Sequence, residues 1–175
     1  MTVFYAVLGF VVLERGAELI LAHRNTARLL RQGAREIDRA GYQWFVVLHA
    51  GWLAALAATV PAATAPDWPL LALLFLLQAG RVWVIASLGR RWTTRLIVLP
   101  AAPPVVRGPY RWLSHPNYLI VFGEVAILPL AFDAIALAIA FSLCNGALLL
   151  RRIRLEQAAL GISSHHIRET LPHRN

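Results

Sequence analysis

The chain has 175 residues, of which 58% are hydrophobic and 15% are charged, and its mean hydropathy is +0.58. This composition excludes an ordinary water-soluble domain. The chain has 17 basic residues, all of them arginine, and 9 acidic residues. Its net charge of +8 by itself suits binding to nucleic acid or to an anionic membrane surface. A single cysteine, Cys144, excludes a disulfide framework and a cysteine-based metal site.

The apolar runs predict an all-α integral membrane protein, with five transmembrane helices in a single domain of residues 1–175. The first run lacks a basic leader and a small-residue cleavage site, so we expect it to be retained as a helix. The run from Tyr118 to Leu150 would be about 50 Å long as one helix, against about 30 Å of hydrocarbon. It must therefore form a tight hairpin, with Pro129 at the bend and Asp133 as the N-cap of the last helix. The expected spans are residues 3–22, 42–60, 68–88, 118–132 and 133–150, with a tail at 151–175.

Arginines in the connections predict the orientation. Fifteen of the 17 lie in the segments 23–41, 89–117 and 151–175, and none lies in the connection 61–67 or at the bend near residue 133. Basic residues stay on the cytoplasmic side, so we expect the N-terminus outside and the C-terminus inside a cell membrane. Most of these arginines are then topology signals that contact anionic headgroups, and nucleic-acid binding loses its support. The long proline-containing segment 89–117 places the chemistry on the cytoplasmic face.

Polar residues at membrane depth predict a cavity that opens to the inner face. Each charge inside a bilayer costs roughly 2.5–3.5 kcal/mol, so it is a functional candidate. Glu14 and Glu18 share a helix face and could pair with Arg81 or His49; buried ion pairs that fix helix packing, and a core histidine, are the alternatives. Arg15 and Arg81 are best explained by the acidic side chains near them. The full set is Glu14, Arg15, Glu18, His49, Gln78, Arg81, Glu124 and Asn145.

The segment from Arg107 to Tyr118 has the densest chemistry in the chain. It combines arginines, aromatic rings and His115 immediately before an apolar run, and Pro116 suits a helix start. Arginine binds carboxylate or phosphate, and aromatic rings stack on a base or face a cation. The pattern favours a ligand with anionic or aromatic parts; an interfacial loop with an aromatic belt is the alternative.

Three motifs together resemble the isoprenylcysteine carboxyl methyltransferase family. They are Gly108-Pro109-Tyr110-Arg111, His115-Pro116-Asn117-Tyr118, and Arg152-Ile153-Arg154-Leu155-Glu156 after the last span, with a further similar run at 87–94. The resemblance covers about residues 33 to 160 and is greatest to short five-span bacterial members. It implies a membrane methyltransferase that uses S-adenosylmethionine without a Rossmann fold or a metal. It also implies a cytoplasmic cofactor pocket formed by the last two helices, the preceding linker and the tail, and a lipid substrate that enters from the bilayer.

The resemblance assigns roles residue by residue. By motif, His115 and Tyr118 resemble cofactor-binding residues, with main-chain contacts at Pro116 and Asn117. Arg152 and Glu156 match the pair required for activity, and their spacing of four puts them on one helix face. The sequence departs from the family's pattern at Ile120, at Gln157 and in the tail from Gly161 to His166, where His165 and His166 are expected in a solvated segment. We further expect cofactor contacts from Tyr110, Glu124 and Glu156, and substrate contacts from His49, Arg81, Trp92 and Arg111.

The leading hypothesis is O-methylation of a membrane-dissolved lipid. The acceptor is a prenylcysteine-like carboxylate or, more plausibly, a hydroxyl of the alkylpyrone or alkylresorcinol type. A phenol with a pKa of about 10 needs a base, and His115, Glu156 and Glu124 are the candidates. An NADPH-dependent lipid reductase, which shares the His-Pro-x-Tyr segment, and a non-enzymatic membrane protein or transporter are the alternatives. The oligomeric state is left open.

Overall fold

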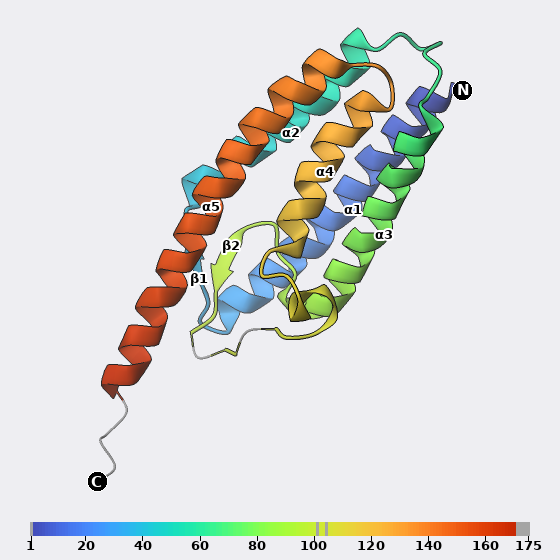
Figure 1. Ribbon diagram of the computed structural model, residues 1–175. Helices are drawn as coiled ribbons and strands as arrows, with labels where there is room; N and C mark the ends of the chain where they lie inside the picture. The colour runs from blue at the N-terminus through green and yellow to red at the C-terminus, as the bar shows by residue number, and fades with distance from the viewer. Residues whose placement is uncertain (1, 101, 104, 171–175) are drawn as a thin grey trace.

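In the computed structural model, which describes residues 2–100, 102, 103 and 105–170, the chain forms an up-and-down bundle of five long helices (Figure 1). Side chains are described up to residue 159. The helices are α1 (Val3–Arg31), α2 (Arg39–Thr59), α3 (Trp68–Leu88), α4 (Pro116–Leu130) and α5 (Ile135–Thr170), with short 3-10 turns η1 (Gly89–Arg91) and η2 (Gly108–Arg111).

Local sequence signals set several helix ends. Asp67 caps α3, since its carboxylate accepts a hydrogen bond from the backbone N–H of Leu70 at 3.0 Å. Pro116 begins α4, where a missing N–H is harmless. Gly33, at φ +87°, ends α1: its N–H bonds to the carbonyl of Leu30, and the next N–H reaches back to Leu29. This pair of bonds is a Schellman motif, which only a residue tolerant of left-handed backbone supports cheaply.

The predicted helices are present, but two of them extend beyond the predicted spans. Helix α3 matches the expected range of 68–88. Helix α1 continues nine residues past Ala22, to Arg31. Helix α5 continues past the expected span to Thr170, so Arg152 and Glu156 of the expected tail lie on a helix, as their spacing predicts. Both extensions carry arginine, leucine and other good helix formers with no proline, so the backbone stays helical after the apolar run ends. His165 and His166 lie outside the residues whose side chains are described.

The bend between α4 and α5 confirms the predicted hairpin and corrects its capping. Helix α5 begins at Ile135, so Asp133 is not its N-cap. Asp133 instead adopts left-handed backbone at φ +58°, a conformation that Asp tolerates better than most residues, and it turns the chain. The carbonyl of Ala131 accepts a hydrogen bond from the N–H of Asp67 at 2.8 Å, which ties this bend to the connection before α3.

The expected all-α fold needs a small correction. Strands β1 (Arg35–Ile37) and β2 (Leu96–Val98) pair antiparallel, with Glu36 opposite Ile97. Arg95 donates to the carboxylate of Glu36 at 3.1 and 3.2 Å and fastens the pair. Three-residue strands leave no alternating pattern in the sequence, and the partners lie about sixty positions apart.

Helix α4 lies in the middle of the bundle, between α3 on one side and α5 on the other, and α5 also runs along α2 (Figure 1). Close approach of α3 and α4 depends on small residues. A Cβ on Gly123 would lie 2.9 Å from the side chain of Leu77, and one on Gly80 would lie 3.4 Å from Ile120. Ile120 therefore fills the space beside Gly80.

Large apolar side chains cover the outside of the bundle. Leu13, Val47, Leu76, Leu119 and Leu143, one from each helix, are all more than half exposed. Such a continuous apolar exterior is typical of a protein surrounded by lipid. Within the described residues, two helices are long and apolar enough to cross a membrane by themselves, at 68–91 and 135–159, and α4 is a shorter apolar helix.

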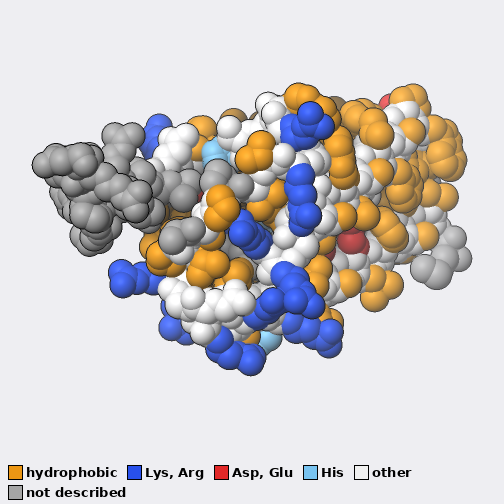
Figure 2. Space-filling model, turned by 90° about the horizontal axis from the view of Figure 1, so that it is seen from below, with side chains coloured by type: hydrophobic (Ala, Val, Ile, Leu, Met, Phe, Trp, Pro, Cys, Tyr) orange, Lys and Arg blue, Asp and Glu red, His pale blue; other side chains and the backbone are white. Residues whose placement is uncertain are grey.

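The arginine-bearing segments meet at one end of the bundle. The strands, η1, η2 and the loops around them lie at the lower end in Figure 1, whereas the N-terminus, the α2–α3 connection and the α4–α5 bend lie at the upper end. Figure 2, seen from below, shows arginine side chains distributed across this lower face. The described parts of the arginine-rich segments therefore lie toward one end of the bundle, and their placement on one side of a membrane stays a prediction.

Candidate active site

A cavity of about 450 Å³ lies at the arginine-rich end of the bundle. All five helices contribute to its wall, together with the segment from Arg91 to Ile97 and Tyr110 of η2. Part of the wall is polar, and part is formed by apolar side chains of α2, α4 and α5, which are Phe45, Val46, Leu53, Val121 and Leu149. The cavity therefore combines a polar and an apolar lining.

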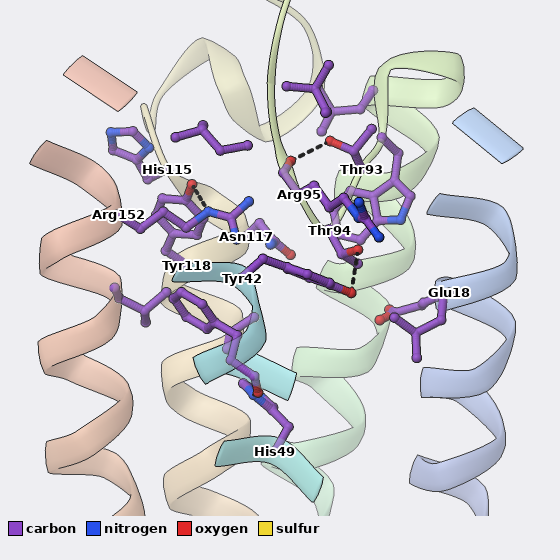
Figure 3. Close-up of a pocket in the computed structure, with 18 of the residues that line it drawn as sticks. Glu18, Tyr42, His49, Thr93, Thr94, Arg95, His115, Asn117, Tyr118 and Arg152 are labelled. Atoms are coloured by element: carbon purple, nitrogen blue, oxygen red, sulfur yellow. Dashed lines mark hydrogen bonds between the residues drawn. The ribbon is translucent and has the colours of Figure 1, made fainter. Parts of the chain in front are cut away.

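Helices α4 and α5 build the polar side around Tyr118. Its hydroxyl donates to Glu156 Oε2 at 2.8 Å and accepts from Arg152 Nε at 3.1 Å. The rings of His115 and Tyr118 stack at 5.1 Å between centroids and 6° between planes, and His115 Nδ1 lies 3.6 Å from Glu156 Oε2. Figure 3 shows His115, Tyr118 and Arg152 together on one side of the pocket. Arg152 and Glu156 thus share one helix face, as their spacing predicts.

Arg152 is held by two aromatic rings. Its guanidinium carbon lies 5.4 Å from the ring centroid of Phe45 on α2 and 5.7 Å from that of Tyr118 on α4, within cation–π range. Only its Nε donates a hydrogen bond to another described residue, so both terminal nitrogens remain available. A guanidinium fixed in this way offers two parallel donors to a carboxylate or an oxyanion.

Four buried polar atoms of residues in the cavity wall have no partner among the described residues. Two are donors, Arg15 Nε and Trp92 Nε1, and two are acceptors, Glu18 Oε1 and Asn117 Oδ1. Leaving a buried donor or acceptor without a hydrogen bond costs about 1–3 kcal/mol. These atoms therefore favour a ligand that carries both an acceptor and a donor.

Tyr110 completes this side of the cavity as a neutral hydroxyl. Burial raises the pKa of Tyr110 to about 12, and the negative charge of Glu156 adds to the shift. The phenol therefore stays protonated at physiological pH and is available as a donor.

Helices α1, α3 and α4 hold a cluster of charges, of which Arg15, Glu18 and Arg81 line the cavity and Glu124 lies behind them. Arg81 Nε donates to Glu124 Oε1 at 2.8 Å, while terminal nitrogens of Arg81 and Arg15 both contact Glu124 Oε2. Glu18 Oε2 accepts from Arg15 at 2.9 Å and from Arg81 at 3.4 Å. The predicted pairing of Glu18 with Arg81 is confirmed, and Arg15 and Arg81 are indeed neutralised by acidic neighbours.

The structure brings most of the predicted site residues to the cavity and leaves three outside its wall. Pro116 shapes the start of α4, and Glu124 is already bonded to two arginines. Arg111 lies against the ring of Trp112, 5.6 Å from its centroid, because η2 turns it away from the cavity. Those that line the cavity are His49, Arg81, Trp92, Tyr110, His115, Asn117, Tyr118, Arg152 and Glu156.

Three cavity residues do not stand out in the sequence. Besides Phe45, these are Tyr42 and Thr94, whose hydroxyls bond at 3.2 Å. Arg95 lies 5.2 Å from the centroid of the Tyr42 ring. The pairing of β1 with β2 brings these segments together, so no sequence pattern could reveal the contact. Tyr42 and Phe45 are aromatic residues three positions apart near the start of α2, and this spacing by itself is too weak a signal to predict a site.

Comparison with known proteins agrees with this geometry. The model of the isoprenylcysteine carboxyl methyltransferase family matches residues 70–162, which include every cavity residue of α3, α4, α5 and the linker before α4. The chain belongs to this family. It is a family of membrane methyltransferases, and the matched residues include much of the cavity wall.

A bacterial relative extends the similarity over most of the chain. The uncharacterized protein YpbQ of Bacillus subtilis (strain 168) is 33% identical over 161 residues, which are 90% of this chain and 96% of that protein. No solved structure gives a significant match. The likeness to a protein of similar length supports a short bacterial-type member of the isoprenylcysteine carboxyl methyltransferase family.

Proposed function

We propose that the protein is an S-adenosylmethionine-dependent O-methyltransferase that acts on a membrane-dissolved lipid. The observation that carries the proposal is the mixed lining of the cavity, in which Arg152, Tyr118 and Glu156 lie beside apolar side chains of α2, α4 and α5. A head group with a reactive oxygen fits the polar side, and an alkyl chain fits the apolar side. Family membership supplies the reaction class.

The polar side offers the groups that the methyl donor requires. The terminal nitrogens of Arg152 suit its carboxylate, and the unpartnered atoms of Asn117 and Trp92 suit a nucleoside, which carries donors and acceptors. The stacked rings of His115 and Tyr118 add an aromatic surface. When bound, S-adenosylmethionine supplies a methyl group on a positively charged sulfur. We propose no metal, and no group of three or more metal-ligating side chains occurs in the described part of the chain.

The charged residues of the cavity contribute to catalysis mainly by positioning the two reactants. Arg152 stabilises negative charge on the attacking oxygen or holds the donor's carboxylate. Glu156, held in place by the hydroxyl of Tyr118, offsets positive charge nearby. Holding two reactants in line inside a cavity removes much of the entropic barrier of a displacement reaction.

The acceptor we favour is a hydroxyl of an alkylphenol, alkylresorcinol or alkylpyrone, entering from the bilayer. The apolar wall includes Val46 and Leu53 on one helix and Val121 and Leu149 on two others, so a single alkyl chain can lie among them. A prenylcysteine-like carboxylate is the other acceptor class that this arrangement serves.

We propose five membrane spans with the N-terminus outside and the C-terminus in the cytoplasm. One domain, residues 1–175, then holds an active site on the cytoplasmic side. The collection of arginines at the cavity end supports this orientation through the positive-inside rule. The apolar exterior of every helix supports five spans, although only two helices pass a simple length and hydropathy test within the described residues.

The test is methyl transfer by purified protein in lipid nanodiscs. Radiolabelled S-adenosylmethionine is incubated with alkylphenols, alkylpyrones and prenylcysteines, and the label in the lipid fraction is counted. We expect transfer to at least one hydroxyl acceptor, and quenching of tryptophan fluorescence by S-adenosylmethionine but not by NADPH. No transfer together with no S-adenosylmethionine binding would contradict the proposal, and binding of NADPH alone would favour a reductase.

A further inference from the structure

His49 lies in the cavity wall on α2, one helical turn beyond Phe45. Figure 3 shows it at the deep end of the pocket, away from Arg152, His115 and Tyr118 at the polar end. Phe45 connects the two ends, because its ring faces Arg152 at 5.4 Å and its carbonyl contacts His49. A head group that reaches from Arg152 past Phe45 therefore meets the imidazole.

The contact with Phe45 determines which nitrogen of His49 carries the proton. Nδ1 of His49 lies 2.8 Å from the carbonyl oxygen of Phe45, four residues earlier in the same helix. A carbonyl oxygen only accepts, so Nδ1 must be the donor. In the neutral imidazole the lone pair then lies on Nε2. No described residue forms a hydrogen bond with Nε2, so this atom is a basic nitrogen without a partner in the cavity wall.

The other basic groups of the site already have partners. Glu18 lines the cavity and keeps one carboxylate oxygen without a hydrogen bond, but it is the counter-ion of Arg15 and Arg81 through the other oxygen. Glu156 accepts a hydrogen bond from Tyr118 and lies beside His115, and His115 itself stacks on Tyr118 in the region proposed for the methyl donor. Glu124 is bonded to Arg81 and Arg15 and does not line the cavity. Each of these groups would have to give up or weaken an existing contact to take a proton from an acceptor.

We propose that His49 is the general base of the reaction, and that the acceptor is a lipid hydroxyl that must lose a proton. The inference rests on the proposed methyltransferase function and narrows its substrate class, because a carboxylate is already ionised and needs no base. The edge of the Trp52 ring, with a centroid separation of 6.3 Å and an interplanar angle of 79°, helps to hold the imidazole in place.

The proton and electron balance of this step is simple. His49 Nε2 takes the hydroxyl proton as the acceptor oxygen forms its bond to the methyl carbon. The carbon–sulfur bond of the donor breaks, and its electron pair remains on sulfur as a neutral thioether. The resulting imidazolium then returns its proton to solvent at the cavity mouth, and no oxidant or reductant is consumed.

The first test compares acceptors of different acidity. His49→Asn keeps an N–H that can reach the Phe45 carbonyl but has no basic nitrogen. We expect it to lower kcat with a simple alkylphenol about 100-fold, the contribution of a well-placed base. With a nitro-substituted alkylphenol, which is already ionised at about pH 8, the loss should be below about fivefold. The matched control, His23→Asn at an exposed histidine of α1, should leave both rates unchanged.

The nitrophenol rate also separates failure of this inference from failure of the proposed function. If His49→Asn methylates both phenols at the wild-type rate, His49 is not the base and the methyltransferase function stands. If both rates fall equally, His49 is a packing residue and the inference is again wrong. If the wild-type protein methylates neither phenol but does methylate a prenylcysteine, the substrate class is overturned; if it methylates nothing, the proposed function itself fails.

A second test needs no methyl donor. Binding of an alkylphenol and of the matching alkyl methyl ether is measured by tryptophan fluorescence, which Trp52 and Trp92 report from beside the imidazole and from the cavity wall. We expect the wild-type protein to bind the phenol about five times more tightly, the value of one hydrogen bond to Nε2. His49→Asn should remove this preference. Equal affinities for phenol and ether in the wild-type protein would contradict the proposed hydrogen bond between the acceptor hydroxyl and His49 Nε2.

Discussion

Two groups of arginine and glutamate lie within the same bundle, and they differ in how completely their charges are paired. In the cluster of Arg15, Glu18, Arg81 and Glu124, three nitrogens of Arg81 contact carboxylates and both oxygens of Glu124 are bonded. At the other group, Arg152 donates to another described residue only through Nε, and Glu156 is about a quarter exposed. The comparison shows that the same residue types serve structure where most of their hydrogen-bonding atoms are paired with one another, and serve a ligand where several are left unpaired.

The largest effect on stability is expected in the cluster that contains Arg81 and Glu124. Arg81→Leu should lower the free energy of unfolding by about 3–5 kcal/mol, because it leaves Glu124 without its main partner in a buried site. Unfolding by SDS in mixed micelles measures this change. The double variant Arg81→Leu with Glu124→Leu should recover much of the loss, since Arg15 and Glu18 remain paired. If Arg81→Leu were as stable as the wild type, this cluster would have no structural role, and the contrast with Arg152 and Glu156 would be lost.

Substitutions of Arg152 and Glu156 should lower turnover and leave stability unchanged. We expect Arg152→Ala and Glu156→Ala each to lower kcat/KM at least about 100-fold, as for the loss of one preorganised electrostatic contact. Thermal unfolding should stay near that of the wild type. Arg154→Ala, at an exposed position of the same helix, is the matched control and should retain full activity. Near-normal turnover in either cavity variant would refute the site assignment.

A smaller effect is expected at Tyr118, which links the two charges. Tyr118→Phe removes the hydroxyl that bonds to both Arg152 and Glu156 but keeps the ring that stacks on His115. We expect a loss of about tenfold in kcat/KM, close to the value of one hydrogen bond to a charged group. Steady-state kinetics measure it. A loss as large as that of Arg152→Ala would mean that the phenol itself takes part in the chemistry.

The smallest effect concerns the ion pair of Arg151 and Asp38 at the arginine-rich end of the bundle. The hydrogen bond from Arg151 holds the pKa of Asp38 below its usual value, and this contact joins α5 to the start of α2. A lowered folded-state pKa adds stability above the unfolded value of about 3.9, and the gain is lost as the pH falls through the folded value. Asp38→Asn, which keeps the cap to Gly41, should therefore be slightly less stable than the wild type at pH 7 and equal to it in acid. A stability difference that does not change with pH would contradict this assignment.

The sequence predicts the helices well where a cap or a proline marks their ends. Asp67 and the apolar run after it give α3 its bounds, and Pro116 places the start of α4 within two residues of the expected span. The ends of α1 and α5 are not predictable from hydropathy, since a helix can continue after its apolar face ends. The site residues of the two motifs are found because they are close in sequence, whereas Phe45 and Tyr42 reach the cavity only through packing.

By itself, the sequence determined a membrane bundle with one arginine-rich end, the family motifs at 108–118 and 152–156, and the spacing that puts Arg152 and Glu156 on one face. The tertiary structure decided which charged side chains are paired with one another and which keep atoms free for a ligand. It paired Glu124 with Arg81 and Arg15, turned Arg111 away, and brought Phe45 between Arg152 and His49. Periodicity reports which residues share a face of one helix, but pairing between helices depends on their packing, which a single sequence does not record.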